Sequence, residues 1–227
     1  MKTRVTKSGY KVIRLLSGRS NAFLLTNGDK NLLIDTSVSR LWEKLLKQLE
    51  NLNIKHIDYL ILTHAHFDHA GNANKINEKF KSTVLIHKEE AGYLQNGDNI
   101  LPDGTTFVTR AIVAVLGARF FHKFRYEPCT PDIIVDDAYN LNELGFNAFL
   151  LATPGHTCGS MSLIIDNELA LVGDAMFGVF SGSVFPPYAQ DIDLMIKSWG
   201  ETVRNQLSGI FTISWLFEQQ IFLTKRL

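Results

Sequence analysis

The sequence predicts an α+β protein in which two mixed β-sheets pack face to face and helices cover the outer faces, giving an αββα four-layer sandwich. Two observations predict this architecture. Each half of the 227-residue chain combines short apolar runs of strand character with an amphipathic segment of helical periodicity. Several apolar runs end directly in histidine or aspartate, which is typical of functional side chains on loops at one rim of a rigid scaffold.

The first half begins with three short strands, and Asn27-Gly28-Asp29 is a hairpin signal between the second and the third. A helix follows, because Leu41, Leu45 and Leu49 recur at helical spacing. The predicted elements of this half are strands at 12–16, 22–26, 31–35, 57–63 and 83–87, helices at 38–52 and 72–80, and a helical turn at 89–94.

The second half contains another group of strands and one helix. The strands are predicted at 133–135, 146–153, 160–166 and 168–172, and Leu194, Met195, Trp199 and Val203 indicate a helix at 192–206. A chain of this length can bury one sizeable core. We therefore expect a single domain over 1–227, with halves at roughly 1–105 and 130–227 that are joined by a partly helical connection.

Composition and charge exclude several classes of function. Hydrophobic residues make up 45% and charged residues 20% of the chain, as in ordinary soluble domains, and 23 basic residues balance 23 acidic ones. A nucleic-acid surface normally shows a basic excess, so no nucleic-acid partner is expected. Two cysteines imply no disulfide framework, and no apolar segment of signal-peptide or membrane-spanning type follows the basic residues 1–5. We expect a cytoplasmic protein without a membrane partner.

The most informative stretch is Thr63-His64-Ala65-His66-Phe67-Asp68-His69, which follows the apolar run 57–62. Imidazole and carboxylate together suit Zn²⁺ or a similar cation. On an extended segment positions i and i+2 share a face, so His64 and His66 can reach one ion. Where the chain turns into a helix, Asp68 and His69 can point to a second position. The alternative is a solvated His-rich turn or a set of core histidines, which a lone histidine would favour.

Two later stretches repeat the form of a strand that ends in a ligand-type residue. They are Thr153-Pro154-Gly155-His156-Thr157 and Val172-Gly173-Asp174. Together with His-x-His-x-Asp-His, and in this order, they resemble the motifs of the metallo-β-lactamase superfamily of hydrolases. The resemblance runs from near Asn21 to about Trp199, and it implies the αββα sandwich. Within the superfamily, the chain resembles the glyoxalase-II-like and lactonase-like branches.

The resemblance also implies a set of metal ligands. His64, His66 and His156 would hold a first metal ion, Asp68 and His69 would hold a second, and Asp174 would bridge both. Asp35 would sit behind a ligand histidine, where an outer carboxylate fixes the tautomer and the ring orientation. The implied cofactor is Zn²⁺, with one or two ions per chain, or another divalent metal.

The chemistry that follows is hydrolysis of a small-molecule ester, thioester or lactone by metal-bound hydroxide, because Zn²⁺ lowers the pKa of bound water toward ~7. Asp68 would be the catalytic carboxylate that orients the hydroxide or carries its proton. Three alternatives stay open. They are a di-iron redox member, which typically has a glutamate where this chain has His66, a nuclease, which the neutral charge disfavours, and a catalytically impaired metal-binding or structural protein.

The last alternative rests on a departure from the family pattern. Members usually supply one more histidine from a Pro-x-His-Gly-like loop near the C-terminus, whereas no histidine here follows His156. The last strand and helix of the second half also have no clear counterpart, so these final elements are expected to be incomplete. The tail after about Gly209 has the form of an out-of-frame reading, because a TCA codon for Ser214 followed by TGG for Trp215 encodes His-Gly in the shifted frame. Any other serine codon at 214 excludes this expectation.

Two further segments leave alternatives open. The apolar segment 107–121 could be a helix that covers the metal rim and lines an apolar substrate pocket, or a packed connecting helix or oligomer contact. The aromatic, Gly- and Pro-rich segment 177–188 could be a pocket wall beside Asp174 or a plain surface loop. The remaining candidates without an assigned role are His56, His87 and His122, predicted as surface or core histidines, and Cys158, predicted as a small buried thiol.

Overall fold

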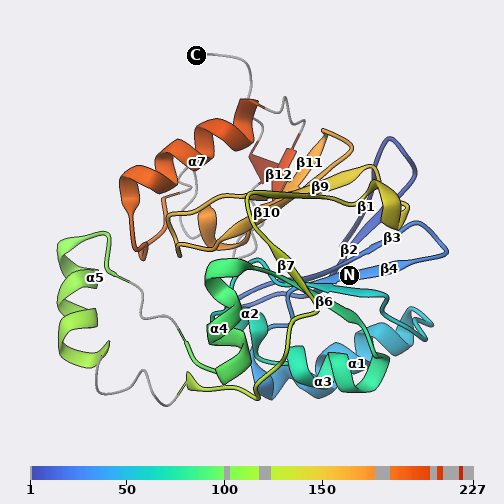
Figure 1. The fold of residues 1–227 in the computed structure, drawn as a ribbon, viewed down its shortest axis with the longest axis horizontal. Coiled ribbons are helices and arrows are strands. Elements are labelled where there is room, and N and C mark those ends of the chain that lie inside the picture. Colours follow the sequence, from blue (N-terminus) through green and yellow to red (C-terminus); the bar gives the residue numbers. More distant parts are fainter. Residues whose placement is uncertain are drawn as a thin grey trace.

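Two β-sheets pack face to face, and helices cover both outer sides (Figure 1). The structure is a computed structural model that describes residues 2–99, 103–117, 124–176, 185–204, 209–211 and 220–221, with side chains up to residue 200. The predicted four-layer αββα arrangement is therefore confirmed.

The first sheet is built mainly from the N-terminal half of the chain. Its strands are β1 (Lys2–Val5), β2 (Lys11–Leu16), β3 (Ala22–Thr26), β4 (Asn31–Ile34), β5 (Tyr59–Ile61), β6 (Thr83–His87) and β7 (Ile133–Val135), paired in this order. The first four strands are antiparallel neighbours, while β4, β5, β6 and β7 pair in parallel. Parallel neighbours need crossover connections, and these bring the helices onto one face of the sheet.

The second sheet is almost entirely antiparallel. Its strands are β8 (Ala138–Asn140), β9 (Ala148–Ala152), β10 (Met161–Ile165), β11 (Leu169–Leu171), β12 (Gly209–Phe211) and β13 (Gln220–Ile221), in the spatial order β13-β12-β11-β10-β9-β8. Only β11 and β12 pair in parallel among these described strands.

The helices lie on the two outer sides, apart from α5 (Phe107–Ile112), which extends to the left side of the molecule in Figure 1. They are α1 (Trp42–Asn51), α2 (Phe67–Ala70), α3 (Ala73–Phe80), α4 (Lys88–Asn96), α5 (Phe107–Ile112) and α7 (Ile192–Arg204). α4 ends at Gly97, whose φ of 62° is left-handed and therefore favours glycine. The first four helices cover the first sheet, and α7 covers the second.

The core between the sheets comes from alternate positions of each strand. Phe23 and Leu25 of β3 and Ile34 of β4 belong to one buried cluster with Leu150 of β9 and Leu163 of β10. Side chains along a strand alternate between the two faces of its sheet, so the intervening residues must be covered from the other side. This double burial explains why the central strands read as continuous apolar runs.

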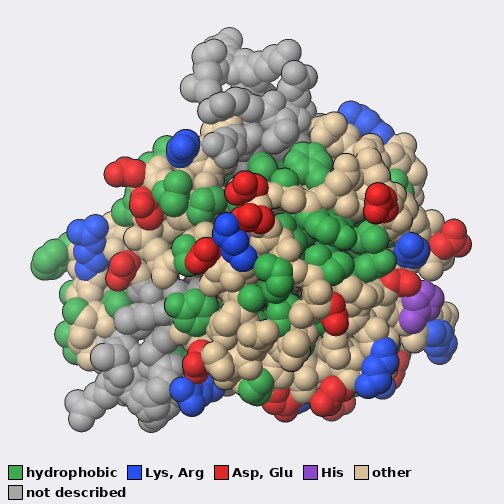
Figure 2. Space-filling model, in the orientation of Figure 1, with side chains coloured by type: hydrophobic (Ala, Val, Ile, Leu, Met, Phe, Trp, Pro, Cys, Tyr) green, Lys and Arg blue, Asp and Glu red, His purple; other side chains and the backbone are tan. Residues whose placement is uncertain are grey.

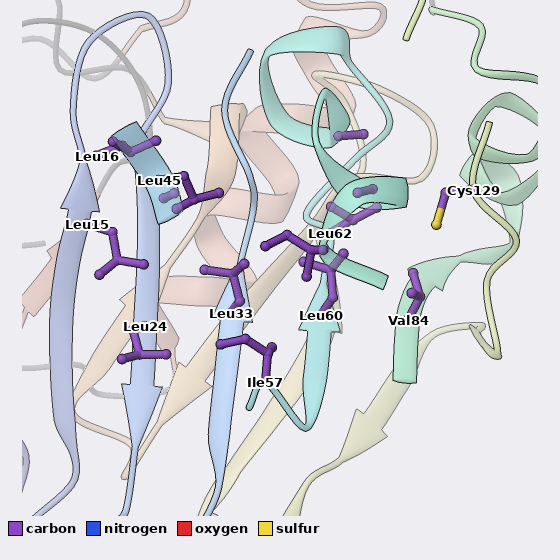
Figure 3. Close-up of a cluster of buried hydrophobic side chains, with 14 of the residues drawn as sticks. Leu15, Leu16, Leu24, Leu33, Leu45, Ile57, Leu60, Leu62, Val84 and Cys129 are labelled. Atoms are coloured by element: carbon purple, nitrogen blue, oxygen red, sulfur yellow. The ribbon is translucent and has the colours of Figure 1, made fainter. Parts of the chain in front are cut away.

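The intervening residues of the first sheet point to the helices. Leu24, Leu33 and Leu60 are fully buried with Leu45 of α1, as Figure 3 shows. Behind the second sheet, the smaller cluster around Ile164 is covered by Trp199 of α7. Both outer faces are therefore closed by helices, and the strand-end loops are left to form a rim.

The structure corrects the predicted order at three places. The strand at 133–135 was expected with the second group, but β7 pairs in parallel with β6 in the first sheet, because proximity in sequence does not fix sheet membership. β1 and β8 were not predicted, since neither short strand has an apolar alternation. β12 pairs in parallel with β11 and extends the second sheet, while the expectation that the final elements of the family are incomplete stays a prediction. The codons suspected of a shift encode residues outside the described ones.

The segment 107–121 is helical as far as residue 117 and continues from α5 into the π-helical turn Val113–Gly117; residues 118–121 lie outside the described part. Phe107 is 88% and Val115 is 72% exposed, so these apolar side chains are not packed against the described residues. The predicted pocket wall at 177–188 is described only from residue 185.

The surface agrees with the balanced charge of the chain. On the face that Figure 2 shows, basic and acidic side chains are interspersed over both halves. α7, with 13 residues, is well short of the ~20 that a bilayer-spanning helix needs. Within the described residues, no helix combines the length and the apolar character required to cross a membrane.

Candidate metal centre

Four histidines and three carboxylates meet at the rim where strand-end loops of both sheets converge. They are His64, His66, Asp68 and His69 from the loop after β5 and the following α2, Asp35 after β4, His156 between β9 and β10, and Asp174 after β11. Each of these residues is at most 7% exposed. Buried imidazoles and carboxylates need partners, so the way they face one another indicates the function of the site.

The first group consists of His64, His66 and His156. The Nδ1 atom of His66 lies 2.9 Å from Nε2 of His64 and 3.1 Å from Nε2 of His156. One ligand atom of each residue lies within 4.8 Å of the others. Three imidazoles around one point suit a tetrahedral metal ion whose fourth position is open to water. The structure thus brings together the three residues predicted to hold the first metal.

The second group consists of His64, His69 and Asp174, again with ligand atoms within 4.8 Å of one another. Nε2 of His69 lies 3.2 Å from Oδ1 of Asp174, but neither buried atom has a hydrogen-bond partner among the described residues. The other oxygen of Asp174 lies 3.7 Å from Nε2 of His156. Asp174 therefore faces both groups, and these orphaned atoms fit a divalent cation.

Asp35 organises the histidines from behind. Its Oδ2 accepts hydrogen bonds from Nδ1 of His69 at 2.7 Å and from Oγ1 of Thr63 at 2.8 Å, and its Oδ1 accepts from the Thr63 amide at 2.8 Å. Since the Thr63 hydroxyl donates to Asp35, it accepts from Nδ1 of His64 at 3.1 Å. Both imidazoles consequently carry their proton on Nδ1 and turn Nε2 toward the centre.

His156 is oriented by the backbone instead. Its Nδ1 donates to the carbonyl of Tyr188 at 3.0 Å, which leaves the lone pair on Nε2, the atom that faces Nδ1 of His66. Asp35 adopts a left-handed φ of 56°, a conformation that aspartate tolerates better than most residues. The sharp turn after β4 directs the carboxylate to Thr63 and His69. The structure places Asp35 where the resemblance implied, behind a candidate ligand.

The electrostatics favour neutral imidazole at two positions. Burial lowers the pKa of His64 well below its usual value, and the neighbouring histidines lower this pKa further. Burial also lowers the pKa of His156. A metal binds the deprotonated nitrogen, so both side chains are ready to ligate without first losing a proton.

His69 and Asp174 behave as a pair. Burial alone would lower the pKa of His69, but the negative charges of Asp174 and Asp35 outweigh it and raise the pKa well above its usual value. Burial alone would raise the pKa of Asp174, but the charge of His69 outweighs it and lowers the pKa. The opposite charges of the two groups favour each other, and a metal ion that binds Nε2 of His69 must displace any proton held there.

Asp68 stands apart from both ligand groups among the described residues. Its Oδ2 accepts a hydrogen bond from Nε of Arg19 at 3.0 Å, and its backbone carbonyl accepts from the Ser20 hydroxyl. The Arg19 guanidinium also lies 4.8 Å from the centre of the Phe67 ring. Burial raises the pKa of Asp68. Arg19 therefore competes with any cation for this carboxylate.

A pocket of about 600 Å³ adjoins the loop that carries His156. Gln190 and Asp191 line it, and their backbone amides donate to the carbonyls of His156 at 3.1 Å and Gly155 at 2.9 Å. Arg110, Val113 and Ala114 of the 107–117 segment form the facing wall. This lining is more polar than the apolar substrate pocket that was one of the two alternatives for segment 107–121.

The other residues singled out in the sequence lie outside both ligand groups. His56 is exposed, and buried His87 caps α4 by accepting from the Glu89 amide, so both are surface or core histidines as predicted. His122 lies outside the described residues. The prediction of a buried thiol at Cys158 is wrong, because the turn after His156 leaves this side chain exposed, whereas Cys129 is buried.

Several contacts of the centre were not predicted from the sequence. Arg19 on Asp68 follows from a turn between strands, and no periodic signal marks it. Glu90, which is fully buried behind the ligand loops, does have a signal. It lies four residues before Leu94 in a predicted helical turn and so shares the buried face of that turn.

Known proteins are similar to this chain in sequence and in fold. The model of the metallo-β-lactamase superfamily matches residues 17–204. A probable metallo-hydrolase of Methanocaldococcus jannaschii is 33% identical over 158 residues, which cover 70% of this chain and 68% of that protein. Hydroxyacylglutathione hydrolase of Pelagibacter ubique is 27% identical over 82% of this chain, which spans 64% of that relative's length.

Other similarities have the same character. Hydroxyacylglutathione hydrolase GloC of Haemophilus influenzae is 27% identical over 83% of this chain and 81% of its own length. Among solved structures, a metallo-β-lactamase of Cronobacter sakazakii with an HARLDQ motif superposes with a TM-score of 0.66 at 16% identity, covering 94% of this chain and 78% of that one. At such identity the superposition shows the fold alone. On the matched region, the sandwich and the ordered motifs, the chain belongs to the metallo-β-lactamase superfamily.

Proposed function

We propose that the chain is a metal-dependent hydrolase of small-molecule carboxylic esters, thioesters or lactones. The observation that carries the proposal is the pair of overlapping ligand groups, joined by His64 and faced by Asp174. Imidazole with carboxylate favours Zn²⁺. His64, His66 and His156 would hold one ion, and His69 with Asp174 would contribute to a second. When bound, the metal supplies Lewis acidity and lowers the pKa of water.

The protein's own groups support this chemistry in distinct ways. Asp35 keeps Nε2 of His64 and His69 directed to the centre, through the contacts described above. Asp68 would accept and return a proton at its carboxylate, and the raised pKa makes it a stronger base than an exposed aspartate. Arg19 would hold that carboxylate in one orientation.

The substrate class rests on two supports. Two relatives bear the name hydroxyacylglutathione hydrolase, which favours a thioester. The pocket beside His156 has the volume of a small-molecule site and offers Arg110, Gln190 and Asp191 as polar partners. A polar acyl or thiol portion would suit this lining better than an alkyl chain.

The second candidate is a metal-binding protein without hydrolytic activity. The contact between Arg19 and Asp68 favours it, because that carboxylate is withheld from the cation. The absence of a histidine after His156 in the sequence acts in the same direction. Both features weaken a second metal site and leave the three-histidine group intact.

Activity and metal content together test the proposal. Protein purified without chelator is analysed for metal and assayed on hydroxyacyl thioesters, aryl esters and lactones, before and after chelator treatment and zinc readdition. We expect about one tightly held zinc per chain and hydrolysis of at least one class that chelator abolishes. Tightly bound zinc without any hydrolysis supports the second candidate, and a protein that binds no divalent metal refutes both.

A further inference from the structure

Glu90 of α4 is a fully buried carboxylate that the proposed reaction does not use. Its Oε2 accepts a hydrogen bond from the Ala65 amide at 2.8 Å, and its Oε1 accepts from the Gly159 amide at 3.2 Å. The Thr157 side chain also donates to it. A buried carboxylate is costly unless it is well hydrogen-bonded, so these donors are what make Glu90 tolerable in the interior.

The two amides belong to the two loops that carry the first ligand group. Ala65 lies between His64 and His66, in the loop after β5 of the first sheet. Gly159 follows His156 by three residues, in the turn before β10 of the second sheet. One side chain from a helix therefore joins the ligand loops of two different sheets.

A second contact shows why this bridge matters. The Met161 amide donates to the Thr63 carbonyl at 2.9 Å, so the two chain segments also meet one residue before His64 and two residues after Gly159. With one contact alone, the loops could pivot about it and change the separation between His66 and His156. With Glu90 in place, the loops are fixed at two points.

Two residues beside Glu90 and Ala65, Gly159 and Tyr126, support this bridge. A Cβ atom on Gly159 would lie 2.5 Å from Cγ of Glu90 and 3.0 Å from its Oε1, so only glycine allows this approach. On the other side of the same peptide segment, the Tyr126 hydroxyl donates to the Ala65 carbonyl at 2.7 Å. Both backbone groups of Ala65 are thus satisfied by buried side chains, and the residue between the two ligand histidines is held at each.

We propose that Glu90 is a positioning residue that sets the spacing of the three-histidine group and thereby its affinity for metal. This inference rests on the proposed metal centre. A metal ion of tetrahedral preference requires its nitrogen ligands at about 2.0–2.1 Å, so a small change in the separation of the loops lowers the affinity for metal. Residues that orient ligands from behind typically change metal affinity by about 10- to 100-fold when they are replaced.

The test compares Glu90→Gln with Glu89→Gln, its exposed neighbour on the same helix. Zinc affinity is measured by competition with a chromophoric chelator, and the visible spectrum of the Co²⁺ form reports the coordination geometry. We expect Glu90→Gln to bind zinc about 10- to 100-fold more weakly and to alter the Co²⁺ bands, with Glu89→Gln unchanged in both. Glu90→Asp, which keeps the charge but shortens the reach, should behave like Glu90→Gln.

The outcomes separate this inference from the proposed function. If the wild type binds no zinc, the metal centre itself is wrong. If the wild type binds zinc and the folded Glu90 variants bind it equally well, the positioning role is wrong, even if their melting temperature falls. If the Glu90 variants fail to fold, hydrogen exchange of the backbone amides is measured on the metal-stripped wild type instead. The amides of Ala65 and Gly159 should be protected from exchange. Exchange as fast as in the exposed turn at Gly28 would refute the proposed bridge.

Discussion

Asp35→Asn should remove the second metal position while leaving the fold intact. Asp35 accepts from Nδ1 of His69 at 2.7 Å, so His69 is protonated there and offers Nε2. The asparagine amide can donate to Nδ1 in place of accepting from it. The proton then moves to Nε2, and a nitrogen that carries a proton cannot ligate a metal. The substitution is nearly isosteric, yet it reverses the tautomer.

The magnitude follows from the contacts. Loss of a group that orients a ligand costs about 10- to 100-fold in metal affinity, which is about 1.4–2.8 kcal/mol. For stability, the Thr63 amide keeps its acceptor and the Thr63 hydroxyl can rotate, so the loss is about 1–3 kcal/mol. A native domain has about 5–15 kcal/mol in reserve, so the variant should fold. Asparagine also tolerates the left-handed φ of 56° at this position.

The assay is a zinc titration with calorimetric or chelator-competition readout, and the control is Asp166→Asn. Asp166 has the same φ of 56° and is also buried, and it accepts from the Ser8 amide at 2.9 Å, the Ser8 hydroxyl at 2.6 Å and Asn147 at 3.0 Å. It follows β10 at the end away from His156. Asp166→Asn should lose stability only. Equal zinc binding by both variants would refute the tautomer argument.

Three further predictions use other contacts. Arg19→Ala frees the Asp68 carboxylate, so elemental analysis at fixed excess zinc should show higher second-site occupancy than in the wild type; unchanged occupancy contradicts the competition. His66→Ala should abolish hydrolysis while Cys158→Ala retains it, and comparable losses in folded proteins would invalidate the ligand assignment. Burial alone would raise the pKa of Asp166, but hydrogen bonds from Ser8 and Asn147 outweigh it and lower this pKa. The contribution of the Asp166 carboxylate to stability is therefore present above the unfolded pKa of about 4 and is lost as pH falls through the lowered value. The melting temperatures of wild type and Asp166→Asn should consequently converge in acid.

The sequence predicts which candidate ligands lie close together, because their spacing has a direct geometric meaning. His64 and His66 are two residues apart on an extended segment, and the structure places both against His156. The central strands were predictable for a related reason. Their two faces pack against a helix layer and a second sheet, so Leu24 and Leu25 are both fully buried and the run is apolar throughout.

Other features could not be predicted because they depend on contacts distant in sequence. β7 follows a long connection and could join either sheet, and only its parallel register with β6 decides. Arg19 reaches Asp68 across 49 positions of the chain. Cys158 follows a buried histidine by two residues, yet the turn places it outside. A pattern of residue types carries no information on the direction of such a turn.

The loops at the rim of the sandwich contain buried backbone amides that lie outside the strand pairing. These loops leave the hydrogen-bond ladders, so their buried amides need other acceptors. Asp35 accepts from the Thr63 amide, and Glu90 accepts from those of Ala65 and Gly159. Each carboxylate thus satisfies the backbone and fixes a candidate ligand loop in the same contact. This dual role accounts for two buried acids beside a site that already contains Asp68 and Asp174, where further negative charge would otherwise be unfavourable.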